Sequence, residues 1–147
     1  MTKQYGKSSL APEAWFHVAE QYYDDQKYAE AGKAHASAKA KATGELAEKS
    51  LYKLAWTRFQ EQNYAGALQT FTEQLQQFPR GELAADAIFM KAECLFRQEK
   101  FAEAWPAYEA ALATKPSTPT AQALLLLHAG QTAAQLKNWN DGAKLIA

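Results

Sequence analysis

The sequence contains the stretch Gly44-Glu45-Leu46-Ala47-Glu48-Lys49-Ser50-Leu51-Tyr52, and 37 residues later it contains Gly81-Glu82-Leu83-Ala84-Ala85-Asp86-Ala87-Ile88-Phe89. An upstream copy, Ser8-Ser9-Leu10-Ala11-Pro12-Glu13-Ala14-Trp15-Phe16, shares the Leu-Ala pair and the two large apolar residues at its end. Self-similarity with a period of roughly 20–50 residues indicates a repeat architecture. The stretch therefore predicts an array of similar units, with one copy at each junction.

Each unit is predicted to consist of two helices separated by a short polar break. In the first unit, apolar residues recur at i, i+3, i+4 and i+7, the pattern of an amphipathic helix: Trp15, Val18, Ala19 and Tyr22. The second helices of the four units open at aromatic residues spaced by 36, 37 and 38 positions: Tyr28, Tyr64, Phe101 and Trp139.

Glycine and proline residues predict where the second helices end. Gly44 is expected to end the helix that runs from Tyr28 to about Thr43, because glycine tolerates the left-handed conformation common at helix C-termini. Pro79 ends the helix of the second unit, and Pro116 follows that of the third. Pro106 is expected within the first turn or so of the third unit's second helix, where proline is tolerated.

These patterns predict an all-α fold of four helical hairpins. The hairpins span about residues 11–43, 45–79, 82–116 and 119–147, in one domain that covers residues 1–147. A junction copy at the start, and an end at Leu145-Ile146-Ala147 midway through a second helix, predict a fragment of a longer array that self-associates through its truncated C-terminal helix.

Composition limits the classes of function. Sixteen basic and sixteen acidic residues give no net charge, which argues against a nucleic-acid or anionic-membrane binder. Lys33, Lys39 and Lys41 fit a solvated helix face. No apolar run approaches the roughly 20 residues of a membrane span, and the N-terminus lacks the apolar core of a secretory signal. We therefore expect a soluble protein, of the periplasm or cell envelope or of the cytoplasm.

The hairpins resemble the tetratricopeptide repeat family. The residues that carry the resemblance are Trp15-x2-Val18-Ala19-x2-Tyr22 on a first helix, and Tyr64, Ala67, Phe71, Pro79 and Phe101, Ala104, Tyr108, Ala111, Pro116 on second helices. Small residues stand where the family's two helices approach closely: Ala19, Ala55, Ala92 and Gly130. The family implies a right-handed superhelix of antiparallel helix-turn-helix repeats.

The sequence departs from the family pattern in three respects. His35 stands where a large aromatic residue is usual, and no proline follows that helix, so we expect a longer second helix and weaker packing in the first repeat. Lys91 stands where the family has leucine. The periods exceed the usual length, which resembles a subtype found in bacterial cell-envelope proteins such as Tol-Pal coordinators and outer-membrane assembly lipoproteins.

The resemblance implies a protein- or peptide-binding scaffold whose concave groove is lined by the first helices. Trp56 is the strongest candidate contact, and Tyr52 and Arg97 are further candidate hot spots, because aromatic residues and arginine dominate interface energies. The groove residues implied are Phe16, His17, Glu20, Tyr23, Lys49, Tyr52, Lys53, Trp56, Phe59, Gln60, Phe89, Met90, Glu93, Phe96, Arg97, Leu127, His128 and Gln131.

Other interpretations of these residues stay open. Six of the aromatic residues also fit simple packing against neighbouring helices: Phe16, Tyr23, Tyr52, Phe59, Phe89 and Phe96. Lys49, Lys53 and Arg97 supply charge for a carboxylate clamp, but the asparagine that such a clamp needs is missing. A structural spacer or oligomerisation segment of a larger multi-repeat protein is the alternative function.

Catalysis is the third class of function, and the sequence does not favour it. The three histidines, His17, His35 and His128, are not at the i, i+4 spacing of a metal site, and no glycine-rich phosphate loop is present. The single cysteine, Cys94, excludes an intramolecular disulfide and is expected to be a buried thiol. We predict no catalytic residue, no cofactor and no metal site.

Overall fold

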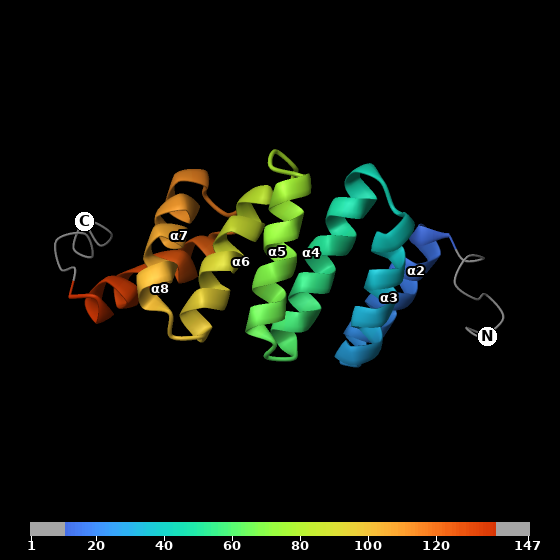
Figure 1. Ribbon diagram of the computed structural model, residues 1–147, viewed down its shortest axis with the longest axis horizontal. Coiled ribbons are helices and arrows are strands. Elements are labelled where there is room, and N and C mark those ends of the chain that lie inside the picture. The colour runs from blue at the N-terminus through green and yellow to red at the C-terminus, as the bar shows by residue number, and fades with distance from the viewer. Residues whose placement is uncertain (1–10, 138–147) are drawn as a thin grey trace. The chain divides into compact units, whose positions relative to one another are not determined.

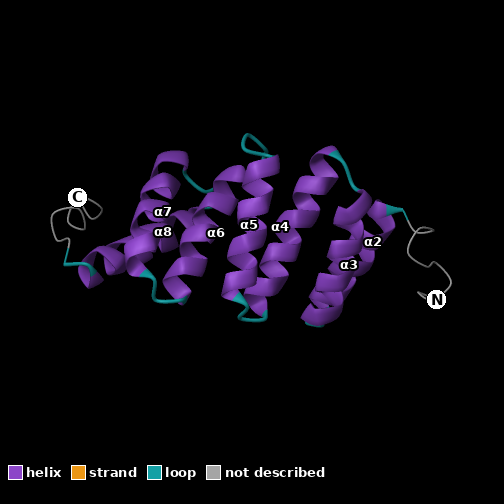
Figure 2. Cartoon of the chain, viewed as in Figure 1, coloured by secondary structure: helices purple, strands orange, loops and turns teal. Residues whose placement is uncertain are grey.

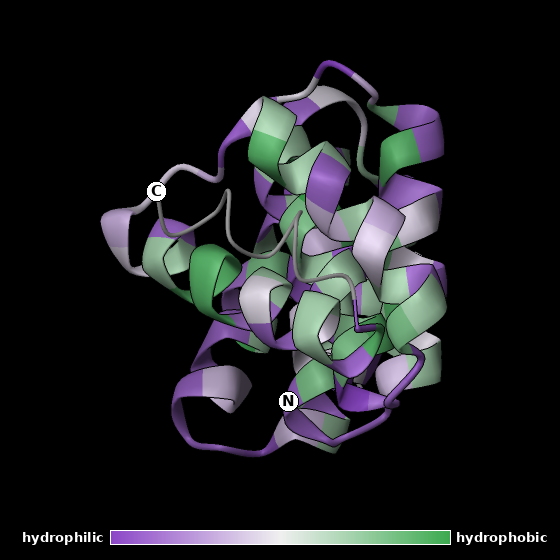
Figure 3. Cartoon of the chain, turned by 90° about the vertical axis from the view of Figure 1, so that its left-hand side faces the viewer, coloured by the Kyte–Doolittle hydropathy of each residue, from purple (hydrophilic) through white to green (hydrophobic). Residues whose placement is uncertain are grey.

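The computed structural model describes residues 11–137, and this part of the chain is helical without any strand (Figures 1 and 2). The predicted all-α fold is confirmed. The helices are α2 (Pro12–Asp24), α3 (Tyr28–Lys41), α4 (Gly44–Gln60), α5 (Tyr64–Gln77), α6 (Ala84–Arg97), α7 (Phe101–Thr114) and α8 (Pro119–Gln135). Hydrophobic and hydrophilic segments alternate along them, as Figure 3 shows.

The chain divides into two compact units, Met1–Gly81 and Glu82–Ala147. In the first unit, α2 packs on α3, α3 on α4 and α4 on α5, and the two first helices α2 and α4 also touch. In the second unit, α6 packs on α7 and α7 on α8, and the first helices α6 and α8 touch. Each unit therefore places the first helices of successive hairpins side by side.

Small residues let the helices of a hairpin approach closely. Ala19, Ala55 and Ala92 on the first helices have no exposed surface, and the same holds for second-helix alanines at equivalent places: Ala31, Ala67 and Ala104. At the fourth position of the first series, a Cβ added to Gly130 would meet nothing within 4 Å. The close approach predicted from the small residues is thus found in the first three hairpins.

A left-handed residue ends each first helix. Gln26, Gln62, Glu99 and Lys137 have φ values of 60°, 62°, 58° and 57°, and they are spaced by 36, 37 and 38 residues. At Gln62 the chain forms the bonding pattern of a Schellman motif, in which the Gln62 N–H donates to the Phe59 carbonyl and the Asn63 N–H to the Arg58 carbonyl, each at 2.9 Å. The turns repeat with the period that the aromatic residues predicted.

Three local predictions were wrong. Gly44 does not end α3 but begins α4 with φ 57°, because Ala42 and Thr43 are already extended and turn the chain. The second helix of the first repeat is not longer, since α3 has 14 residues, as do α5 and α7. Pro106 lies in the second turn of α7, not the first. Proline has no N–H to donate to the carbonyl four residues earlier, which belongs to the exposed residue Ala102.

The two junction copies differ in their first three residues. The first copy is helical from Gly44 onward, whereas Gly81, Glu82 and Leu83 precede α6. The buried carboxylate of Glu48 lies against Gly81, so close that a Cβ at position 81 would overlap it. The packing of Glu48 on this turn explains why a residue without a side chain stands at position 81.

Candidate protein-interaction surface

The two first helices of the first unit are joined by polar contacts. Lys53 Nζ on α4 lies 3.1 Å from Glu20 Oε2 on α2 and 5.7 Å from the centroid of the Tyr23 ring. Gln60 Nε2 donates to the Tyr23 hydroxyl at 3.3 Å. Four predicted groove residues are thus brought together, and they bridge α2 to α4.

Aromatic rings cluster on α4 of the same unit. Trp56 contacts Tyr52 and Phe59 on its own helix edge to face, with centroid distances of 6.4 and 5.7 Å. Tyr52 and Phe59 in turn pack against Phe71 and Tyr64 of α5, at 5.9 and 5.0 Å. The packing interpretation therefore holds for Tyr52 and Phe59, whereas the ring contacts of Trp56 are with its own helix.

Other predicted aromatic residues also contact the second helix of their own repeat. Phe16 lies 5.3 Å from His35, Tyr23 lies 5.2 Å from Tyr28, and Phe96 lies 5.8 Å from Phe101. Phe89 is buried, with 5% of its surface exposed. These side chains therefore pack within their own hairpins.

His35 is fully buried between the helices of the first unit. Burial, and secondarily the charge of Lys53, lowers the pKa of His35 to about 4, so its imidazole is neutral at pH 7. Its Nε2 lies 3.4 Å from Glu20 Oε1. Neither ring nitrogen has a hydrogen-bond partner within residues 11–137. Because the imidazole of His35 is neutral, its approach to Glu20 is not an ion pair.

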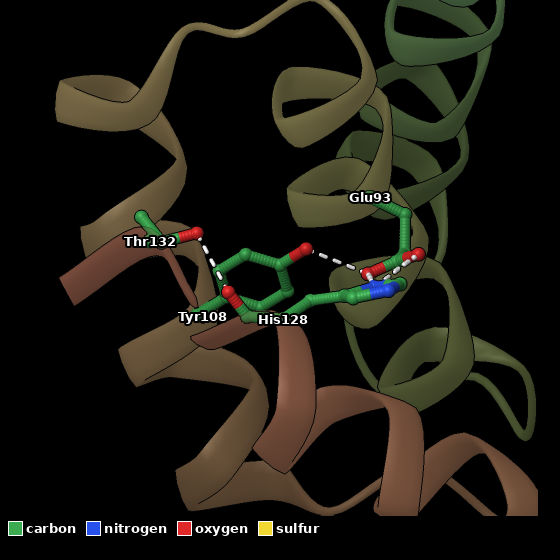
Figure 4. A network of polar contacts seen from close by, with 4 residues as sticks. All are labelled: Glu93, Tyr108, His128 and Thr132. Carbon is green, nitrogen blue, oxygen red and sulfur yellow. Dashed lines mark hydrogen bonds and ion pairs between the residues drawn. The ribbon is translucent and has the colours of Figure 1, made fainter. Parts of the chain in front are cut away.

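A buried glutamate organises the second unit (Figure 4). Glu93 on α6 accepts a hydrogen bond from the Tyr108 hydroxyl on α7 at 2.6 Å. His128 Nδ1 on α8 lies 2.8 and 3.0 Å from the two oxygens of the same carboxylate. Burial, and next the Glu93 carboxylate, raises the pKa of Tyr108 far above its usual range, so the phenol stays a donor. Glu93 therefore links three helices.

His128 is oriented by two further contacts. Its ring stacks on Phe96 of α6, with centroids 4.5 Å apart and planes at 14°. The Thr132 hydroxyl donates to the His128 carbonyl at 2.8 Å, one turn along α8 (Figure 4). With Nδ1 directed at Glu93 and one face on Phe96, the imidazole has a defined orientation.

The thiol of Cys94 lies beside this network and has no exposed surface. Burial, and next the charge of Glu93, raises its pKa to about 12. The thiol is protonated at neutral pH, and the prediction of a buried thiol is confirmed. Residues 11–137 contain no group of three His, Cys, Asp or Glu side chains placed to bind a metal ion. None of the described helices has the length and apolar character needed to cross a membrane.

A family model described as "Tetratricopeptide repeat" matches residues 58–127. The matched segment, residues 58–127, therefore contains tetratricopeptide repeats. Among solved structures, pilF of Pseudomonas aeruginosa is similar in fold, with a TM-score of 0.74 at 15% sequence identity. The similarity covers 98% of this chain and 62% of that chain, so this chain spans less than two thirds of pilF. No curated protein matches the sequence.

The repeat period places the contacts of Glu20 and those of Glu93 at equivalent positions. At the period of 36 and 37, Glu20 corresponds to Trp56 and Glu93, and His35 corresponds to Phe71 and Tyr108. At the period of 37 and 38, Lys53 corresponds to Met90 and His128. Each unit therefore has a glutamate on a first helix with two contacts. One is with a ring on the second helix of the same repeat, and the other is with a basic residue on the first helix of the following repeat. We call these sets the Glu20 trio (Glu20, His35, Lys53) and the Glu93 trio (Glu93, Tyr108, His128).

The predicted groove residues fall into three groups by exposure. Six are exposed: His17, Lys49, Gln60, Arg97, Leu127 and Gln131. Nine are half-buried: Phe16, Glu20, Tyr23, Tyr52, Lys53, Trp56, Phe59, Phe96 and His128. Three are buried beneath the surface: Phe89, Met90 and Glu93.

Sequence reasoning missed the partners of the glutamates. His35 was interpreted only as a departure from the family pattern, and Tyr108 only as a match to it. The signal was present in the repeat period, because Glu20 and Glu93 occupy the same repeat position and each is aligned with a polar ring. The predicted self-association end, residues 145–147, lies outside the described residues, as does Trp139.

Proposed function

We propose that the chain is a non-catalytic scaffold that binds a protein or an extended peptide segment on its first helices and needs no cofactor. Tetratricopeptide repeats generally mediate interactions between proteins. The proposed surface consists of α2 and α4 in the first unit, and of α6 and α8 in the second. One surface belongs to each compact unit.

The exposure and packing of the Trp56 side chain support this proposal most directly. It stands half-exposed on α4, between the exposed residues Lys49 and Gln60 on the same helix face. Its ring contacts come from Tyr52 and Phe59, which are themselves held against α5. A large aromatic side chain, supported from below and open above, is the arrangement found at interface hot spots.

The surface of the second unit is supported in a different way. Leu127 is 54% exposed on α8, and Gln131 on α8 and Arg97 on α6 are also exposed. Phe89, Met90 and Glu93 are buried and would support the surface without touching a partner. The proposed contacts of this unit therefore lie mainly on α8, with Arg97 from α6.

The test is affinity capture of partners from cells of the source organism, with Trp56→Ala and a matched control, Trp105→Ala. Trp105 is half-exposed like Trp56, but it stands on the second helix α7. We expect Trp56→Ala to weaken capture about 30-fold, the effect of losing a hot spot of about 2 kcal/mol, and Trp105→Ala to leave it unchanged. If Trp56→Ala combined with Arg97→Ala keeps every partner while the fold survives, the groove proposal is wrong.

A second candidate function is a structural or self-associating segment of a larger repeat protein. Within residues 11–137 the large hydrophobic residues that are exposed all lie on α8 or directly after it: Leu124, Leu126, Leu127 and Leu136. Sedimentation of the parent chain and of Leu126→Gln/Leu127→Gln separates the candidates. A parent dimer that the substitutions dissociate supports self-association, and a monomeric parent at high concentration counts against it.

The cell-envelope location suggested by the longer-period subtype remains part of the proposal. Fractionation of source cells tests it with an antibody against the chain. Recovery only in the cytoplasmic fraction would contradict a cell-envelope role.

A further inference from the structure

At the repeat period, the positions of the Glu20 trio and the Glu93 trio correspond to two apolar residues of the second repeat and one of the third. Trp56, Phe71 and Met90 are the equivalents of the two glutamates, of the two buried rings and of the two basic residues. The repeat scaffold thus tolerates apolar side chains at all three positions. Burial of apolar surface does not explain why two of the three sets are polar.

Stability is also a weak explanation for a buried carboxylate. Glu93 is 4% exposed, and its desolvation offsets much of what its hydrogen bonds contribute. Replacement of a buried polar set by apolar residues of similar volume is often neutral or stabilising. Apolar residues at these positions cannot fix the orientation of their neighbours, because apolar contacts are non-directional. Hydrogen bonds can, since they have preferred distances and angles.

The hydrogen-bonding contact of Glu93 with His128 constrains the orientation of α8 and therefore of its exposed side chains. His128 contacts the carboxylate of Glu93. Its neighbours on the helix surface are Leu124, four residues before it, and Gln131, three residues after it, and Leu127 lies next to these two. All three are exposed. A rotation of α8 about its axis would break the two-oxygen contact of His128 and would also change which of these side chains face a partner.

We propose that Glu93 is a positioning residue of the interaction surface in the second unit, where it fixes the rotation of α8 on α6 by holding His128 and Tyr108 together. Glu20 does the same for α4 on α2 through Lys53. This inference rests on the proposed function for its biological meaning, but the positioning itself is a property of the chain without a partner.

Spin-label distances between α6 and α8 test the positioning. Labels are placed at Lys91→Cys and Gln135→Cys, and the native Cys94 is expected to stay unlabelled because it is buried and protonated. In the parent chain we expect a single narrow distance distribution. Glu93→Gln should broaden and shift it, and Glu109→Gln, an exposed glutamate on α7, is the matched control that should leave it unchanged.

An apolar trio separates positioning from stability. Glu93→Leu/Tyr108→Phe/His128→Met gives the second unit an apolar set at the three positions, and we expect it to unfold at a urea concentration near that of the parent. Its distance distribution should nevertheless be broad. If the apolar trio keeps the narrow parental distribution, the positioning role is wrong.

A conservative pair of variants protects the test against simple misfolding. His128→Asn places an N–H donor the same number of bonds from Cβ as Nδ1, and we expect it to preserve the narrow distribution, whereas the isosteric His128→Leu should lose it. Equal distributions for the two would overturn the proposal. Since none of these measurements includes a partner, failure of the positioning is distinguishable from failure of the groove, which is judged by capture with Trp56→Ala.

Discussion

Ser117 donates both its backbone N–H and its hydroxyl to the carboxylate of Asp86, each at 2.8 Å, across 31 residues of sequence. Asp86 lies in the first turn of α6, and Ser117 lies in the connection between α7 and α8. The next residue, Thr118, caps α8 by accepting from the Ala121 N–H at 3.1 Å. The Asp86–Ser117 contact therefore fixes the point from which α8 begins.

Asp86→Ala is expected to destabilise the second unit by about 1–3 kcal/mol, because hydrogen bonds to a charged group contribute about this much. Urea unfolding followed by circular dichroism measures the change. Asp86→Asn retains one acceptor oxygen and should lose less. Equal stability of Asp86→Ala and the parent would show that the contact contributes nothing.

His35→Phe is expected to raise stability and to flatten its pH dependence. The folded pKa of His35 is lowered from 6.5 to about 4, so between these values the unfolded state binds the proton and the folded state does not. The stability that comes from keeping His35 neutral is therefore fully present above pH 6.5 and is lost as the pH falls toward 4. The free energy of unfolding decreases by roughly 3 kcal/mol over this range.

Thermal unfolding at pH 4.5 and pH 7.5 checks this prediction. Phenylalanine also removes two buried nitrogens without hydrogen-bond partners in the described part of the chain, and Phe71 is the equivalent residue of the second repeat. His17→Phe makes the same change at an exposed site and should alter stability by no more than about 0.5 kcal/mol. A His35→Phe variant that keeps the parental pH profile would contradict the assignment.

Gly81→Ala is expected to destabilise the first unit by about 1–3 kcal/mol, because the new Cβ would displace the buried carboxylate of Glu48. Gly130→Ala is the matched control. Its Cβ would meet nothing within 4 Å, so the change should stabilise α8 by up to about 1 kcal/mol. The reverse order of the two variants in a thermal melt would show that Glu48 does not constrain position 81.

Gln62→Gly is expected to stabilise the first unit by up to about 1 kcal/mol, because a left-handed conformation costs a non-glycine residue roughly 1–2 kcal/mol. The gain is reduced by the greater freedom of glycine in the unfolded chain. Gln69→Gly, at an exposed position inside α5, should instead cost about 1 kcal/mol. A loss of stability in Gln62→Gly, seen as a lower melting temperature, would argue against the strain.

Local patterns in the sequence were sufficient to predict the helices. The periodic apolar residues and the aromatic residues that open the second helices predicted α2 to α8, because helix formation depends on contacts three and four residues apart. The left-handed turns were not predicted, since glutamine, glutamate and lysine at Gln62 and its equivalents give no conformational signal. Gly44 gave such a signal but was assigned to the wrong helix, because the sequence does not show on which side of the turn the left-handed residue falls.

The candidate surface depended more heavily on tertiary structure. The sequence predicted that Glu93 and His128 line one groove. It did not reveal that Glu93 is buried or that Tyr108 is the third residue of the Glu93 trio. These residues are 15 and 35 positions from Glu93, and a hydrogen bond forms only when helix packing brings donor and acceptor within about 3 Å. The sequence by itself determined the repeats and the residues on each first helix. Only the tertiary structure decided which of those residues face solvent and which hold the helices together, because burial depends on what covers a side chain.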